Sequence, residues 1–343
     1  AGALIFSLLF FALARPVLTL CGATGDTYDT AFGYAMWVVV IGGPATILGT
    51  LLANLVRAEG SAASASAGLS LGGILNLILD PFFVLPQFLG LGAAGAGMAT
   101  ALSNLAAVLY FLIYIRRKRG QTVLRAGISI LPEAARHAKE ILFTGFPSAV
   151  QYALTVVAVA AQSRFVSLYT TEAMAALGIV KKLDQLPLYF SIGVANGLLP
   201  LLAYNFASGN QERRRKAFSF GCAVSLSFAL FCLVCYELFA PQLAALFISD
   251  PLTIEYGAGF LRRMVTAMPM MSLCYPMILQ FQAMGRLKES LICSVLRKGV
   301  LDVPLLFIMN GLFGLYGCMW VQPIVDGISL VVAGSFYARL RER

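Results

Sequence analysis

The feature of this chain that most restricts its fold is a series of apolar stretches, each about 20 residues long, that recurs from one end to the other. A helix of this length spans the roughly 30 Å hydrocarbon core of a bilayer. Only 12% of the residues are charged, against about 25% in soluble proteins, and the mean hydropathy is +0.82. The sequence therefore predicts an all-α integral membrane protein and excludes a soluble domain with a single anchor.

Ten membrane spans are expected in the chain. Their approximate ranges are 1–21, 31–55, 64–86, 91–115, 141–168, 173–199, 217–240, 258–283, 289–310 and 315–338. Basic residues concentrate in alternate loops, which is the pattern of the positive-inside rule and predicts a cytoplasmic C-terminus. The net charge of +9 is thereby explained by topology, without nucleic acid binding.

The chain also repeats itself. When the sequence is shifted along itself so that Pro16 falls on Pro241, the same shift matches Leu18 with Leu243, Pro44 with Pro269, Ala58 with Ala283, and Gly60 with Gly285. Further along, a slightly smaller shift matches Gly92 with Gly314, Gly95 with Gly317, and Asn104 with Asp326. An even number of predicted spans separates the two copies, so both have the same orientation. Parallel repeats are a transporter architecture, in which the substrate site lies between the repeats.

The repeat predicts how the chain is divided. Residues 1–115 form the remainder of a first lobe with about four spans, 116–140 form a cytoplasmic connector, and 141–343 form a second lobe with six spans. The chain begins inside an apolar run without an initiator Met, and the second copy begins near His137, so we expect about two further spans upstream. The fold class is therefore two parallel six-helix lobes around a central cavity, with twelve spans in the full protein.

Asp80 lies in an almost unbroken apolar run from Gly72 to Leu85. A charge at the centre of a membrane helix costs roughly 2.5–3.5 kcal/mol on insertion scales, so such residues usually face a cavity and are functional. Asn76 lies one turn earlier on the same helical face. The alternative is a structural hydrogen-bonding role beside Pro81, whose ring leaves a backbone carbonyl without a partner.

Several other residues have both a structural and a functional interpretation. Asp302 is close enough along a helix to pair with Lys298 or Arg297. A Met-rich span between Met264 and Met284 either fills gaps in the core or forms an adaptable wall for varied substrates. The candidate residues of such a substrate cavity are Gln151, Met268, Met271, Tyr275 and Gln280.

The predicted spans contain no His, no clustered metal ligands and no nucleophile with a base beside it. These absences argue against a membrane enzyme, and they predict neither an organic cofactor nor a transition-metal site. Cys232 and Cys235 have no further ligands at metal spacing, so we interpret them as small apolar residues.

Seven motifs follow one another along the chain. They are Arg57-Ala-x-Gly60, Asn76-Leu-Ile-Leu-Asp80-Pro81, Gly92-Ala-Ala-Gly95-Ala-Gly97-Met-Ala-Thr100, Gly145-Phe-Pro147-Ser, Gly193-x-x-x-Gly197-x-x-Pro200-x-x-x-Tyr204-Asn205, Gln282-Ala-Met-Gly285-Arg286 and Gly314-Leu-Tyr-Gly317 leading to Pro323-x-x-Asp326. Each motif is short, but their order is specific and covers essentially the whole chain. In these motifs the chain resembles the multidrug and toxic compound extrusion (MATE) family, in its bacterial multidrug-efflux branch.

The resemblance implies a secondary antiporter that exports small organic, often cationic, compounds in exchange for protons or sodium. It implies a coupling-cation site made of Asp80, Asn76 and Thr100, with sodium or a proton at Asp80, together with an acidic residue of the family's first helix that this chain does not contain. Thr155 stands where some branches carry a second-lobe Glu, so that second site is not carried over. The implied setting is a monomer among the lipids of a bacterial plasma membrane.

A second function is compatible with the same architecture. A lipid-linked saccharide flippase of the wider superfamily would also use two parallel lobes, but it should have a more cationic cavity to bind pyrophosphate. Only Arg164, Lys181 and Lys182 are candidates for that charge. Transport of a cationic dye under an imposed gradient would separate the two functions.

Overall fold

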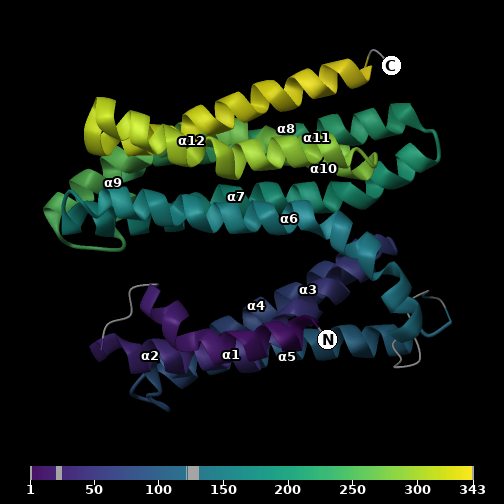
Figure 1. Cartoon of the computed structure of the whole chain (residues 1–343), viewed down its shortest axis with the longest axis horizontal. Helices are drawn as coiled ribbons and strands as arrows, with labels where there is room; N and C mark the ends of the chain where they lie inside the picture. Colours follow the sequence, from purple (N-terminus) through teal and green to yellow (C-terminus); the bar gives the residue numbers. More distant parts are fainter. Residues whose placement is uncertain (1, 21–24, 121, 123–130, 342–343) are drawn as a thin grey trace. The chain divides into compact units, whose positions relative to one another are not determined.

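The computed structural model describes residues 2–20, 25–120, 122 and 131–341, and these residues form helices and no β-strand, apart from one isolated bridge between Arg119 and Thr122. The predicted all-α fold is therefore confirmed. The chain divides into two compact units, Ala1–Ile130 and Leu131–Arg343, and the division falls within the predicted connector. In each unit the long helices lie side by side with roughly aligned axes (Figure 1).

The first unit packs around its last helix. Its elements are α1 (Gly2–Leu20), α2 (Gly25–Ala35), the π-helix η1 (Met36–Ile41), α3 (Gly43–Ala58), α4 (Ala62–Val84) and α5 (Gly92–Arg117). Helix α5 contacts α2, η1, α3 and α4. The α5 residues Gly95, Gly97 and Ala99 are buried, and such small residues let membrane helices approach closely. A core that includes Leu52, Val56 and Phe111 closes the other end of this packing.

The second unit contains longer helices. They are α6 (Leu131–Val166), α7 (Thr171–Ala207), α8 (Gln211–Ala245), α9 (Pro251–Met264), the 3₁₀-helix η3 (Val265–Ala267), α10 (Met268–Ala283), α11 (Leu287–Val295), the π-helix η4 (Leu296–Val300) and α12 (Asp302–Arg341). Its main core is formed by apolar side chains from α7, α8, α9 and α12, among them Leu177, Phe260 and Met319.

Side-chain caps begin three of these helices. The Asn210 side-chain oxygen accepts a hydrogen bond from the backbone N–H of Arg213 (3.1 Å) at the start of α8. The Thr170 hydroxyl accepts a hydrogen bond from the backbone N–H of Ala173 (3.1 Å) at the start of α7. The Asp250 carboxylate accepts one from the backbone N–H of Thr253 (2.8 Å) at the start of α9. Hydrogen bonds from Thr253 also hold the pKa of the Asp250 carboxyl below its ordinary value. Such caps satisfy amides that have no partner within the helix and so fix where each helix begins.

The internal repeat is visible in the backbone. Helices α3 and α10 begin at the repeat-matched residues Gly43 and Met268 and end at the matched residues Ala58 and Ala283. Each helix is followed by a glycine in the left-handed region, Gly60 (φ 85°) and Gly285 (φ 70°). The later matched pair, Gly92 (φ 55°) and Gly314 (φ 60°), has the same property. Only glycine adopts these angles readily, so the matched glycines mark equivalent breaks in the two copies.

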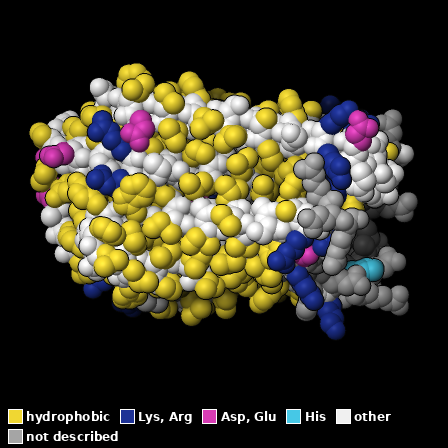
Figure 2. Space-filling model, turned by 90° about the horizontal axis from the view of Figure 1, so that it is seen from above, with side chains coloured by type: hydrophobic (Ala, Val, Ile, Leu, Met, Phe, Trp, Pro, Cys, Tyr) yellow, Lys and Arg dark blue, Asp and Glu magenta, His cyan; other side chains and the backbone are white. Residues whose placement is uncertain are grey.

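Among the described residues, seven helices are long and apolar enough to cross a membrane, or eight if the pair Tyr28–Ile41 and Gly43–Ala58, bent by 44°, is one span. This count is lower than the ten expected spans for two reasons. Helix α12 contains parts of two expected spans, which are separated by the non-helical backbone of Gly314 (φ 60°, ψ −142°). In α6, only the stretch Tyr152–Val166 qualifies, as a shorter apolar helix. On the face drawn in Figure 2, apolar side chains cover the middle and charged side chains lie toward the ends.

Candidate functional site

The structure brings together the three residues of the predicted cation site. The Asn76 Nδ2 atom lies 3.4 Å from the Asp80 Oδ1 atom and 3.4 Å from the Thr100 Oγ1 atom. Asn76 and Asp80 are one turn apart on α4, and Thr100 faces them from α5, where its hydroxyl donates to the Ala96 carbonyl oxygen (2.9 Å). All three side chains are partly buried. The Asn76 amide therefore links a carboxylate and a hydroxyl across two helices.

Close packing of α4 and α5 places these residues opposite each other. A Cβ atom on Gly72 would lie 3.3 Å from the Ser103 carbonyl oxygen and 3.3 Å from the Ala107 Cβ atom. A Cβ atom on Gly95 would collide with the Phe83 carbonyl oxygen. The two helices thus approach at backbone distance on both sides of the Asn76 level, because glycine has no side chain.

Asp80 has no basic partner in the described part of the chain, because no Lys or Arg nitrogen there lies within 4.0 Å of its carboxylate. The next residue, Pro81, lies inside α4 and has no N–H, so the carbonyl of Leu77 loses its usual helical partner. The site therefore presents a carboxylate with neighbouring oxygen atoms, and from the described residues the carboxylate receives a hydrogen bond but no ion pair. Carboxylate, amide carbonyl and hydroxyl oxygens are ligands that hard cations prefer.

The second unit carries a different polar cluster. The Arg297 Nε atom lies 2.7 Å from the Asp326 Oδ1 atom, and both side chains are fully buried. The Gln322 Nε2 atom donates to Asp326 Oδ2 at 2.7 Å, and the guanidinium carbon of Arg297 lies 4.3 Å from the centre of the Tyr275 ring. Local spacing offered Asp302 as a partner for Arg297, but the ion pair that Arg297 forms in the structure is with Asp326, further along α12. The side chain of Lys298 lies outside those described.

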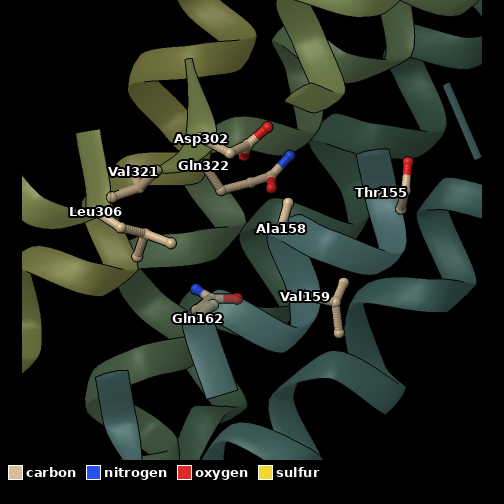
Figure 3. Close-up of a pocket in the computed structure, with 8 residues that line it drawn as sticks. All are labelled: Thr155, Ala158, Val159, Gln162, Asp302, Leu306, Val321 and Gln322. Atoms are coloured by element: carbon tan, nitrogen blue, oxygen red, sulfur yellow. The ribbon is translucent and has the colours of Figure 1, made fainter. Parts of the chain in front are cut away.

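A small polar cavity lies in the same unit (Figure 3). Its volume is about 30 Å³, and its lining residues are Thr155, Ala158, Val159 and Gln162 from α6 and Asp302, Leu306, Val321 and Gln322 from α12. A space of this size holds about one water molecule. The shift that matches Gly92 with Gly314 also matches Asp80 with Asp302 and Thr100 with Gln322. This cavity therefore lies at the repeat-related position of the first unit's cluster.

The predicted substrate-cavity residues are mostly interior. Met268, Met271 and Gln280 are at most 3% exposed, and Tyr275 is half-buried against Arg297. The side chain of Gln151 lies outside those described. None of these residues lines either of the two cavities found in the second unit, so their part in substrate binding stays a prediction.

Sequence reasoning did not find the pair of Arg297 with Asp326. The one signal for it was the repeat, in which Asp326 takes the place of the neutral Asn104. In the first unit the Asn104 Nδ2 atom donates to the Thr46 Oγ1 atom (2.8 Å), so a polar side chain points between helices in both copies, but only the second copy is charged.

Comparison with known proteins gives a consistent family. The family described as MatE matches residues 147–308. The chain is 28% identical over 346 residues to the multidrug export protein MepA of Staphylococcus aureus, which covers all of this chain and 75% of the relative. It is 28% identical over 342 residues to MepA of Staphylococcus saprophyticus, which covers all of this chain and 74% of the relative.

Two solved structures share its fold. The outward-facing conformation of a multidrug resistance MATE family transporter has a TM-score of 0.85 at 23% identity, over 99% of this chain and 76% of the other. The Vibrio cholerae MATE transporter VcmN in the bent form has a TM-score of 0.81 at 20% identity, over 98% of this chain and 76% of the other.

Proposed function

Because the chain belongs to the multidrug and toxic compound extrusion family, we propose that it is a secondary antiporter that exports small organic cations, including drugs and toxins, in exchange for protons or sodium. Members of this family are transporters rather than enzymes. The relatives that match the whole chain are multidrug export proteins, which supports the efflux of organic compounds.

The observation that carries the proposal is the cluster of Asn76, Asp80 and Thr100. Asp80 is partly buried in an apolar helix and has no basic partner among the described residues. A carboxylate in such a place is stabilised by a mobile cation, since no fixed one is present. The site is therefore suited to bind and release a proton or a sodium ion.

The geometry suggests what each residue does. In the structure, the Asn76 amide donates its N–H groups to the Asp80 carboxylate and the Thr100 hydroxyl. Rotating this amide by half a turn would present its carbonyl oxygen to the same space. The oxygens of Asp80, Asn76 and Thr100 could then coordinate sodium together, while a proton would need Asp80 alone as its acceptor.

Ion binding and transport are coupled through charge. The conformation that buries Asp80 most deeply is favoured when its carboxylate is neutralised, because burying an uncompensated charge is costly. Loss of the ion favours the conformation in which Asp80 is hydrated and able to attract a cationic substrate. The ion and the substrate then bias one two-state equilibrium in opposite directions, which is the requirement for exchange.

Reconstitution in sealed vesicles tests the proposal. A fluorescent organic cation is loaded, and its movement is followed under an imposed pH gradient, an imposed sodium gradient, or neither. We expect dye movement to depend on one of the two gradients. Movement that is independent of both would contradict antiport, and movement of a lipid-linked pyrophosphate instead would favour the flippase.

A further inference from the structure

Arg263 is an unusual charge for its position. It lies near the end of α9, within the segment Pro251–Ala283 that is long and apolar enough to cross a membrane. Among the described residues, no carboxylate oxygen lies within 4.0 Å of it. Intramembrane arginines normally pair with an acidic group, a carbonyl or a ligand, so the surroundings of Arg263 indicate what it could bind.

The Arg263 side chain is held in place by its neighbours. Its Nη1 atom donates to the Gly259 carbonyl oxygen (2.7 Å), and its guanidinium carbon lies 4.1 Å from the centre of the Tyr316 ring. The first contact uses one of five N–H donors, and the second orients the guanidinium plane. The charge is therefore positioned, but it is not neutralised.

The neighbouring arginine behaves differently. Arg262 is 50% exposed, and its Nε atom lies 3.9 Å from the Glu237 Oε2 atom on α8. It carries the same charge at nearly the same depth, yet it has an acidic partner. Arg262 therefore provides a matched control for Arg263.

A cavity of about 410 Å³ lies beside Arg263. It is lined by Arg263, Met309, Phe313, Tyr316, Trp320 and Ile324. The volume is within the range of small-molecule sites, and five of its six walls are apolar or aromatic. Phe313 is 64% exposed and Trp320 is 40% exposed, so the cavity opens on the surface of the unit. The non-helical backbone of Gly314 lies between two of the lining residues, Phe313 and Tyr316.

The depth of Arg263 fits the boundary between headgroups and acyl chains. It lies roughly 18 Å along the helix from Pro251, in a segment about 50 Å long at 1.5 Å per residue. A roughly 30 Å hydrocarbon core centred on this segment would leave Arg263 about one side-chain length inside the core, from where arginine reaches headgroups by snorkelling. Trp320 and Tyr316 are residue types enriched at that boundary.

We propose that this cavity binds an anionic phospholipid. The lipid phosphate accepts hydrogen bonds from the free N–H donors of Arg263, and an acyl chain packs against Phe313, Trp320 and Ile324. One fixed positive charge above an apolar wall is complementary to an amphipathic anion. A free inorganic anion would leave the apolar wall without a partner, and a zwitterionic lipid would bring its own cation to the same place.

The test measures lipid binding to the purified protein in neutral detergent. Phosphatidylglycerol and phosphatidylcholine with matched acyl chains are titrated separately, and bound lipid is counted by native mass spectrometry. We expect phosphatidylglycerol to bind about fivefold more tightly, the effect of one basic residue on an anionic lipid. Arg263→Gln should remove this preference, and Arg262→Gln should keep it.

Three outcomes would overturn the proposal. The first is equal binding of the two lipids by the unaltered protein, and the second is an equal loss of preference in Arg262→Gln and Arg263→Gln. The third is displacement of phosphatidylglycerol by millimolar inorganic phosphate, which would indicate a free-anion site. If Arg263→Gln does not fold, Phe313→Ala is the deciding variant. It should weaken the binding of both lipids and preserve the ratio of their affinities. Unchanged binding of both lipids would contradict this cavity as the site.

Discussion

Asp80 in the first unit and Asp326 in the second are both carboxylates within predicted membrane spans, but their surroundings are opposite. Asp326 is fully buried and bonded to Arg297 and Gln322. Asp80 is partly buried and bonded to the neutral amide of Asn76. One carboxylate has a permanent cation and is a fixed part of its unit. Among the described residues Asp80 has no such cation, and this difference is the reason for our proposal that it binds a mobile ion.

The repeat shows that this difference arose on a common backbone. The matched glycines and the matched bounds of α3 and α10 show that the two copies share their helix ends. At other matched positions, however, Asn104 corresponds to Asp326 and Thr100 to Gln322. The polar residues have therefore diverged while these helix ends have not, and the two units have taken separate electrostatic roles.

The largest expected effect comes from breaking the fixed pair. Arg297→Met would leave Asp326 buried without its cation, which costs roughly 3–5 kcal/mol. We expect a large fall in folded yield and in unfolding temperature in detergent, measured by static light scattering and tryptophan fluorescence. The double substitution Arg297→Met with Asp326→Leu should recover most of the loss. A single substitution that is as stable as the unaltered protein would contradict the structural role of the pair.

A smaller effect tests the shared backbone. A Cβ atom on Gly95 would collide with the Phe83 carbonyl oxygen, and one on Gly317 with the Met309 carbonyl oxygen. Gly95→Ala and Gly317→Ala should each destabilise by about 1–3 kcal/mol, because backbone must move to admit the methyl group. Gly73→Ala, whose Cβ atom would meet nothing within 4 Å, is the control. Unequal effects at Gly95 and Gly317 would show that the two copies differ in packing as well as in charge.

The smallest expected effect concerns the ion site itself. Thr100→Val removes one oxygen that faces Asn76, and we expect the half-saturating concentration of the coupling ion to rise about fivefold, the equivalent of one hydrogen bond of roughly 1 kcal/mol. Stability should change little, since the hydroxyl is only partly buried. The matched control is Thr50→Val, which removes a hydroxyl bonded to the carbonyl of Thr46 on α3. If the half-saturating ion concentration were the same in both variants, Thr100 would not be part of the ion site.

Much of the fold could be predicted from apolar length and repeat spacing. The repeat matched Gly60 with Gly285, and in the structure both glycines have a positive φ angle, a conformation that only glycine adopts readily. The spacing of Asn76 and Asp80 predicted their contact, because residues one turn apart share a helical face. The place of Thr100 in the site was predicted only from the family resemblance, since its approach to Asn76 depends on how α4 packs against α5.

The parts that could not be predicted depend on longer-range packing. Local spacing placed Asp302 within reach of Lys298 and Arg297, but Arg297 pairs with Asp326, which lies 29 residues away and is brought close only by the packing of the unit. The Met-rich span was compatible with a core or a substrate wall, and only the burial of Met268 and Met271 places them in the interior.

We propose that Asp80 couples transport to a cation because no described residue gives its carboxylate a basic partner. The most direct test is Asp80→Asn in the vesicle assay, with correct insertion checked by size-exclusion chromatography and unfolding temperature. We expect a folded protein of nearly unchanged stability that still binds the organic cation but no longer moves it in response to a pH or sodium gradient. Gradient-driven transport at the unaltered rate in this variant would contradict the account.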